Sequence, residues 1–350
     1  MNGHSVGRAE DTVPHSVESL EERLSRPTAG VVEALRQCPG DVAVLGAGGK
    51  MGATFARMAR RAADELGDGR RVVAISRFSS PETAEMLRGA GVDVLPADLF
   101  DRHALAALPD VANVLYLVGQ KFGTTTFPAG TWMANVIVPY LVADRYRGSR
   151  IVALSSGNVY PLVPVRGPAS REQDAVAPVG EYAATCVGRE RVFEHAASLG
   201  TRVAIVELNY AVDLRYGVLV DVALKVWRGE PVDVEMGYAN VIWQGDACAQ
   251  ALQCLPLASA PPRVVNVTGG EALSIQSVAL ELGRLLGRTP RITGHEAADA
   301  LLSDTSLARS LFGPPTISTD TLLAWVAEWI RAGQPLLGRS THFEERHGRF

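Results

Sequence analysis

The chain has 350 residues, 47% of them hydrophobic and 21% charged, with a formal net charge of −4. This composition is typical of a globular protein with a large core, and the charge does not favour nucleic acid or an anionic membrane as a partner. The four cysteines show no CxxC spacing, and no apolar run approaches the roughly 18 residues of a membrane span. We therefore expect a cytoplasmic protein with reduced thiols.

Residues 1–40 are predicted to form an N-terminal arm. The first 27 residues are rich in Glu, Arg and Ser, which predicts a loose segment with one short helix at Ser16–Leu24. Thr28 is a residue type that caps helices, so a second short helix is predicted to begin there and to end near Pro39 and Gly40.

Strands and helices alternate over residues 41–208. Continuously apolar runs predict strands at 41–45, 71–75, 92–95, 111–118, 150–154 and 202–208. Helices are predicted at 51–66, 82–88, 103–108, 132–147 and 182–198. Because the strands are apolar throughout, both faces of the sheet should be buried. The pattern predicts an α/β fold of the Rossmann type, with a doubly wound parallel sheet.

Beyond residue 208 this rhythm changes. Helices are predicted at 218–227, 246–255 and 274–286, and short strands at 232–235, 240–243 and 264–267. We expect residues 209–335 to form a smaller substrate-binding lobe, interleaved with the Rossmann domain, over the carboxyl ends of its strands. Residues 336–350 are expected to form a tail that either folds back or reaches a partner subunit.

A glycine-rich loop joins the first predicted strand to its helix. Glycines at 46, 49 and 52 give the spacing G-x-x-G-x-x-G. The first permits a tight turn, the second lets the backbone approach a pyrophosphate, and the third lets the helix pack closely on the sheet. An ordinary turn is the alternative, but the order strand, loop, helix favours a nicotinamide dinucleotide. The predicted contacts in this loop are Gly46, Gly48, Gly49, Lys50, Met51 and Gly52.

The second strand is followed by Ser76 and Arg77, where cofactors without a 2′-phosphate usually meet Asp or Glu. A guanidinium there can pair with a 2′-phosphate, with assistance from Lys50, so NADP is expected in preference to NAD. The alternative is that Arg77 only stacks on the adenine. The other predicted cofactor contacts are Asp98 and Leu99 after the third strand, and Val118 and Gly119 after the fourth.

Two polar segments complete a resemblance to a known family. Ser156 follows the fifth strand, four residues before Tyr160, and Tyr182 begins the next predicted helix. Together with the glycine loop, the chain resembles the extended short-chain dehydrogenase/reductase family, the nucleotide-sugar epimerase and dehydratase group, over roughly residues 41–290. The resemblance implies that Ser156 hydrogen-bonds the substrate oxygen. It implies that Tyr182 exchanges a proton with that oxygen while hydride moves to or from the nicotinamide.

The family's Tyr-x-x-x-Lys pattern is broken, because Cys186 stands at the lysine position. In the family that lysine holds the nicotinamide ribose and lowers the pKa of the tyrosine, and a neutral thiol can do neither. Three explanations stay open. Another cation substitutes, for which Lys121 after the fourth strand is the candidate; Tyr182 acts only as a proton donor; or the site no longer transfers hydride.

The resemblance also bears on the substrate. Sugar dehydratases of the family place Asp-Glu directly after the serine, where this chain has Gly157 and Asn158, so a dehydratase mechanism lacks its groups. Polar residues at strand ends and in the second lobe are predicted to contact a polyhydroxylated or acidic ligand. They are Asn158, Tyr160, Asn209, Tyr210, Arg215, Trp243 and Gln244.

These patterns predict an NAD(P)-dependent epimerase or ketoreductase that acts on a sugar-like or hydroxy-acid small molecule through hydride transfer. The alternatives are a catalytically silent dinucleotide-binding sensor or regulator, and a lyase that works through a transient ketone. No metal site is predicted. By analogy with the family, the helices at 132–147 and 182–198 would pair two subunits in a homodimer.

Overall fold

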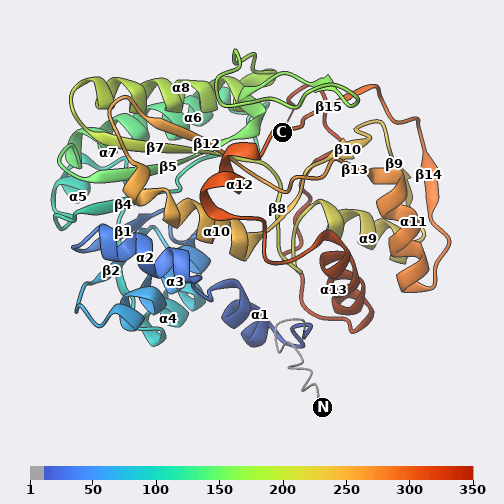
Figure 1. The fold of residues 1–350 in the computed structure, drawn as a ribbon, viewed down its shortest axis with the longest axis horizontal. Coiled ribbons are helices and arrows are strands. Elements are labelled where there is room, and N and C mark those ends of the chain that lie inside the picture. The colour runs from blue at the N-terminus through green and yellow to red at the C-terminus, as the bar shows by residue number, and fades with distance from the viewer. Residues whose placement is uncertain (1–11, 350) are drawn as a thin grey trace, which may run out of the picture.

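A computed structural model describes residues 12–349 (Figure 1). Its centre is a seven-stranded sheet in the order β12-β7-β5-β4-β1-β2-β3, in which all neighbouring strands are parallel. The strands are β1 (Val42–Leu45), β2 (Val72–Ser76), β3 (Asp93–Pro96), β4 (Asn113–Tyr116), β5 (Arg150–Ser156), β7 (Arg202–Leu208) and β12 (Arg263–Val267). The predicted doubly wound α/β fold of the Rossmann type is confirmed.

Both faces of this sheet are buried, as the continuous apolar runs predicted. In β1, Val42 and Val44 pack into one core with the helices of one face, while Ala43 and Leu45 pack into a second core on the other face. The first face is covered by α2 (Ala29–Gln37), α3 (Gly52–Leu66), α4 (Pro81–Gly89), α10 (Gln244–Gln253) and α12 (Ser306–Phe312). The second face is covered by α5 (Arg102–Ala106), α7 (Val138–Arg145) and α8 (Gly180–Ser198).

The helix predicted at 132–147 is interrupted. The chain forms α6 (Pro128–Trp132), a π-helical turn at Met133–Ile137 and then α7. Pro139 has no N–H to donate to the carbonyl of Asn135, so a regular α-helical ladder cannot continue through this point. The turn therefore has a local cause, and it places Asn135 at the edge of the site described below.

The short helix predicted at Ser16–Leu24 is present, and it packs against the rest of the fold instead of lying loose, whereas residues 1–11 lie outside the described part of the chain. Ser16 caps α1 (Val17–Leu24), and Leu20 and Leu24 are fully buried. Glu21 of α1 forms an ion pair of 2.7 Å with Arg215. The helix is amphipathic, and its apolar side completes the core of the second lobe. Thr28 caps α2 as predicted.

The second lobe has its own hydrophobic core among α9 (Val218–Arg228), α11 (Ile275–Leu286) and α13 (Thr319–Arg331) (Figure 1). Short strand pairs surround it: β6 (Val163–Pro164) with β15 (Asp299–Ala300), β8 (Ala211–Val212) with β11 (Ile242–Trp243), β9 (Pro231–Asp233) with β14 (Arg291–Thr293), and β10 (Tyr238–Ala239) with β13 (Leu273–Ser274). The strand predicted at 264–267 is not part of this lobe, because β12 extends the main sheet beside β7. Its residues contact the cores on both sheet faces.

The C-terminal segment folds back on its own chain. Phe343 is buried in the core of the second lobe, and Thr341 lies against α9. We call residues 336–349 the C-terminal strap. The four cysteines are free and buried. None of the helices within residues 12–349 has the length and hydrophobicity that crossing a bilayer requires.

Candidate active site

Two adjoining cavities lie at the carboxyl ends of the central strands. One, of about 330 Å³, is bounded by the glycine loop, the ends of β5 and β7, and the start of α8. The other, of about 660 Å³, continues past the ends of β2 and β3. Gly46, Gly119 and Lys121 line both cavities. The two volumes thus form one groove at the sheet edge where doubly wound folds bind dinucleotides.

The glycine loop is shaped by contacts that exclude side chains. Gly46 has a φ of +90°, and its N–H donates to the carbonyl of Ile75 at 2.8 Å. A Cβ on Gly52 would lie 2.5 Å from the Cα of Ala47, and a Cβ on Gly48 would lie 2.8 Å from Oγ of Ser76. Met51 and Gly52, at the start of α3, border the 330 Å³ cavity, and the N-terminus of a helix favours a negative charge. The loop therefore fits a pyrophosphate.

Most of the predicted cofactor contacts line this groove. Gly46, Gly49, Lys50, Met51, Gly52 and Gly119 border the 330 Å³ cavity, and Ser76, Arg77, Asp98, Leu99 and Val118 border the 660 Å³ cavity. Gly48 lines neither and instead packs against Ser76.

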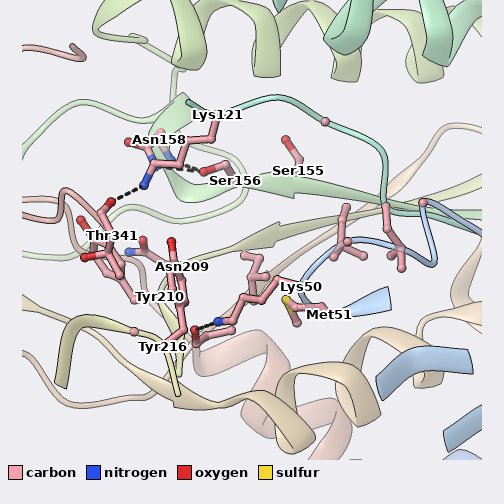
Figure 2. A pocket seen from close by; sticks show the side chains of 18 of the residues that line it. Lys50, Met51, Lys121, Ser155, Ser156, Asn158, Asn209, Tyr210, Tyr216 and Thr341 are labelled. Carbon is pink, nitrogen blue, oxygen red and sulfur yellow. Dashed lines mark hydrogen bonds between the residues drawn. The ribbon is translucent and has the colours of Figure 1, made fainter. Parts of the chain in front are cut away.

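The expected assistance of Lys50 to Arg77 is not possible in this arrangement. Nζ of Lys50 donates to the carbonyl of Ala211 at 2.8 Å and lies 4.3 Å from the ring centroid of Tyr216. It therefore points toward the second lobe and away from the adenosine end, as Figure 2 shows. Burial lowers the pKa of Lys50 to about 8, and Asp213 partly opposes this shift.

The predicted serine and tyrosine meet in the 330 Å³ cavity. The phenol of Tyr182 is hydrogen-bonded to Ser156 and also to Cys186. Asn158 holds Ser156 from the other side, since its Nδ2 and backbone N–H both donate to Oγ of Ser156, at 3.0 and 3.2 Å (Figure 2). The end of β5 and the first turn of α8 thus bring together the residues expected to act on the substrate oxygen.

The surroundings of Tyr182 keep its proton on the phenol. Burial raises the pKa of Tyr182 well above its ordinary value, and Cys186 raises it further, while the guanidinium of Arg189 partly opposes both. Burial also raises the pKa of Cys186, so this thiol is neutral near pH 7. These shifts leave Tyr182 without the lowered pKa that the family's lysine supplies.

Lys121 lines both cavities from the loop after β4. Its ammonium donates to the backbone carbonyl of Thr341 at 3.1 Å. Burial lowers the pKa of Lys121 to about 8, with Cys186 and Asp221 acting in the opposite direction. The cation expected to replace the missing lysine therefore lies in the same cavity as Tyr182.

Three predicted substrate contacts, Asn158, Asn209 and Tyr210, line the 330 Å³ cavity. Tyr160, which is 2% exposed, lies away from it and donates from its hydroxyl to Glu207 at 2.6 Å. The 3-10 turn after Ser156 directs the ring of Tyr160 into the interior.

The other three predicted substrate contacts also lie away from the cavity. Trp243 packs edge-to-face on Trp325 at 5.7 Å, within the core of the second lobe. Gln244 is buried and donates to Oγ1 of Thr54 at 3.0 Å. Arg215 forms ion pairs of 2.7 Å with Glu21 and 3.1 Å with Asp213. None of the three residues lines either cavity.

Asn135, which the sequence analysis missed, connects the elements around Lys121 and Tyr182. Its Oδ1 accepts from the N–H of Gln120 at 2.8 Å and from Nη2 of Arg189 at 2.9 Å. Its Nδ2 donates to the carbonyl of Gln120 and to Oγ1 of Thr185, both at 2.9 Å. One buried amide thus connects the loop after β4 to α8, and no local sequence pattern predicts these contacts.

Other missed residues also border the cavity. Ser155, Tyr216 and Thr341 line it. The hydroxyl of Ser155 donates to the buried carboxyl of Glu190. Burial raises the pKa of Glu190 to about 7. The adjacency of Ser155 to Ser156 was an available signal. No sequence signal indicated Thr341, because only the tertiary path of the chain brings it to the cavity.

Several solved structures of other proteins share the fold of this chain. No protein-family model and no curated protein matches the sequence. MoeE5 in complex with UDP-glucose and NAD is 21% identical, with a TM-score of 0.67 over 84% of this chain and 99% of MoeE5. UDP-glucose 4-epimerase from Thermotoga maritima is 16% identical, with a TM-score of 0.69 over 84% of this chain and 99% of that enzyme.

UDP-glucose 4-epimerase from Thermus thermophilus, in complex with NAD, is 18% identical, with a TM-score of 0.66 over 83% of this chain and 99% of that enzyme. Likeness at these identities establishes the fold, and the chemistry has to be argued from the site. Within residues 12–349, no group of three or more His, Cys, Asp or Glu side chains is placed to hold a metal ion.

Proposed function

We propose that this chain is an NAD(P)-dependent ketoreductase or epimerase of the extended short-chain dehydrogenase/reductase type. Its substrate would be a sugar-like or hydroxy-acid small molecule. The observation that carries the proposal is the Tyr182–Ser156 hydrogen bond in the cavity that the glycine loop also lines. The solved neighbours add support, since two of them are complexes with NAD.

In this proposal the nicotinamide, when bound, supplies or accepts the hydride. Ser156 holds the substrate oxygen, and Asn158 fixes the serine hydroxyl by donating to it. Tyr182 delivers its phenolic proton to that oxygen. Because the phenol stays protonated near pH 7, these residues by themselves favour reduction of a ketone over oxidation of an alcohol. Lys121 supplies a positive charge beside the developing oxyanion.

The cofactor form is a separate part of the proposal. The expected preference for NADP is not supported by the solved neighbours, of which MoeE5 and the Thermus thermophilus enzyme are complexes with NAD, and Lys50 does not reach the adenosine end. Arg77, an exposed residue that borders the 660 Å³ cavity, is the group that would favour a 2′-phosphate. We therefore propose that the chain uses a nicotinamide dinucleotide and that Arg77 sets the discrimination.

The function is tested by following nicotinamide absorbance with a panel of keto acids and with UDP-glucose and UDP-glucuronic acid. Tyr182→Phe should lower kcat by about 10³-fold, because it removes the proton donor and leaves the ring in place. Lys121→Ala should lower kcat by about tenfold through loss of the charge. Tyr238→Phe, on β10 and outside both cavities, is the matched control. Unchanged rates in both site variants would contradict the mechanism.

The raised pKa of Tyr182 also favours a second candidate, a catalytically silent dinucleotide-binding regulator. Such a protein would bind the dinucleotide with the same affinity in the wild type and in Tyr182→Phe. It would also turn over no member of the substrate panel.

We further propose a homodimer. Trp132, Met133, Ile137 and Tyr140 expose apolar side chains along α6, the π turn and α7, next to α8. An apolar stripe of this kind suits a four-helix contact between two copies. Sedimentation velocity should find a dimer for the wild type and a monomer for Ile137→Asp, and a monomeric wild type would contradict it.

A further inference from the structure

The C-terminal strap forms part of the wall of the reaction cavity. Thr341 lines that cavity together with Ser156 and Tyr182. Figure 2 shows Thr341 facing Lys121 across the cavity, with the hydrogen bond between them drawn. An acceptor for Lys121 thus comes from the C-terminal strap, outside the sheet and its helices.

Two matched contacts fix the strap on α9. Oδ2 of Asp221 accepts from the N–H of Thr341 at 2.7 Å and from its Oγ1 at 2.6 Å. One helical turn further along, Nζ of Lys225 pairs with the carboxylate of Glu344 at 3.0 Å. Asp221 is 9% and Thr341 4% exposed, so the first contact is shielded from water and strong.

The rest of the strap is anchored on both sides of the site. Phe343 is buried in the core of the second lobe. Arg346 pairs with the carboxylate of Asp299 and donates to its carbonyl at 3.1 Å. Gly348 packs directly against the backbone of Val179 and Gly180, where α8 begins just before Tyr182. The strap is therefore a fixed wall that spans the second lobe and the helix of the proposed proton donor.

One partner of Lys121 belongs to this wall. The ammonium, withdrawn from bulk water, donates to the carbonyl of Thr341 at 3.1 Å. A lysine side chain has a flexible four-carbon stem, so a fixed acceptor decides where its charge is held. The carbonyl is itself fixed, since the same residue is bound to Asp221 through its N–H and its hydroxyl.

We propose that Thr341 and Asp221 are positioning residues of the active site. Asp221 fixes the strap, and the Thr341 carbonyl holds the ammonium of Lys121 beside Ser156 and Tyr182. The catalytic benefit rests on the proposed function, whereas the control of Lys121 by the strap does not.

The use of lysine in this chain supports the proposal. Only three of its 34 lysine and arginine residues are lysines, at 50, 121 and 225. Two of the three bind the strap, Lys121 at Thr341 and Lys225 at Glu344. A compact ammonium suits a single carbonyl or carboxylate, whereas the larger guanidinium fork requires several acceptors.

The scarcity of lysine also makes the test direct. With lysine labelled with ¹³C at Cε, the spectrum contains three side-chain signals, which single Lys→Arg variants assign. In the full chain the Lys121 signal should titrate near pH 8. Deleting residues 339–350 should let water reach the ammonium and raise this pKa toward about 10.4. Lys50, held by Ala211 and Tyr216, is the reference within the same spectrum.

If the truncated chain does not fold, two substitutions at Thr341 that change no charge provide the same test. Thr341→Val removes the hydroxyl that donates to Asp221, and Thr341→Ser keeps it. The Lys121 signal should shift in the first and stay in place in the second, with Leu337→Ala, an exposed position of the strap, as the control. In turnover, Thr341→Val should lose about tenfold in kcat, with the affinity for NADH changed less than about twofold.

Lys121 titrating at the same pH in the full chain, the truncated chain and Thr341→Val would overturn the proposal. A shift of the Lys121 signal in a protein that turns over no substrate would support control by the strap and contradict the proposed function. The two ideas therefore fail separately.

Discussion

The two ends of the groove are built differently. At the dinucleotide end the pyrophosphate site is made chiefly of backbone, because one loop of seven residues, Gly46–Gly52, runs from β1 into α3. At the reaction end it is made of side chains from separate segments, namely the ends of β4, β5 and β7, the start of α8, and the C-terminal strap. The first end needs contiguous residues of permissive shape, and the second needs distant residues with particular partners.

The two ends of the groove also differ in their titratable groups. Around the reaction end, burial shifts the pKa values of Lys121, Tyr182, Glu190 and Glu207. The cofactor loop offers backbone N–H groups, which do not titrate, and its one titrating side chain, Lys50, points toward the second lobe. Substitutions that add side-chain atoms should therefore weaken dinucleotide binding, and changes of pH should alter the groups at the reaction end.

The largest effect is expected from Gly52→Ala. The added Cβ would lie 2.5 Å from the Cα of Ala47, and backbone cannot move aside as a flexible side chain can. Dinucleotide affinity should fall about 100-fold, or about 3 kcal/mol. Isothermal titration calorimetry measures it. The control is Gly89→Ala on α4, where an added Cβ meets nothing within 4 Å. Equal dinucleotide affinities in Gly52→Ala and Gly89→Ala would show that close backbone contact does not decide binding at the dinucleotide end.

A smaller effect, confined to the reaction end, is expected from Glu207→Gln. Burial raises the pKa of Glu207 to about 9, above the unfolded value of about 4.3. Between these values the folded chain binds the extra proton, so the free energy of unfolding falls as pH rises. The variant lacks this titration and should gain about 2 kcal/mol relative to the wild type between pH 6.5 and pH 8.

Urea unfolding at the two pH values measures that gain. Glu194→Gln, a more exposed position on α8, is the control. A constant difference between Glu207→Gln and the wild type would show that Glu207 is ionised throughout the range.

The smallest effect is expected from Arg77→Ala at the adenosine end. If Arg77 pairs with a 2′-phosphate, NADPH affinity should fall about fivefold and NADH affinity should not change, because an exposed charge pair contributes about 1 kcal/mol. Arg102→Ala on α5 controls for loss of surface charge. NADH binding tighter than NADPH in the wild type, unaltered in Arg77→Ala, would exclude the role given to Arg77.

The sequence predicted the Rossmann half of the molecule closely. β7 begins and ends at the residues expected, and the glycine loop lies between β1 and α3 as its spacing indicated. Strands buried on both faces and loops of close backbone contact impose their requirements on neighbouring residues, so local patterns record them. β12 was misplaced because a short apolar run does not specify which sheet edge it joins.

The reaction end shows the opposite relation. The sequence by itself determined the residue types at the ends of β5 and α8, and with them the meeting of Ser156 and Tyr182. Only the tertiary structure decided that Tyr160 turns inward to Glu207, and that Thr341 turns toward Lys121. Burial and pairing of a polar side chain depend on which distant segment reaches it. Adjacent residues do not encode that information.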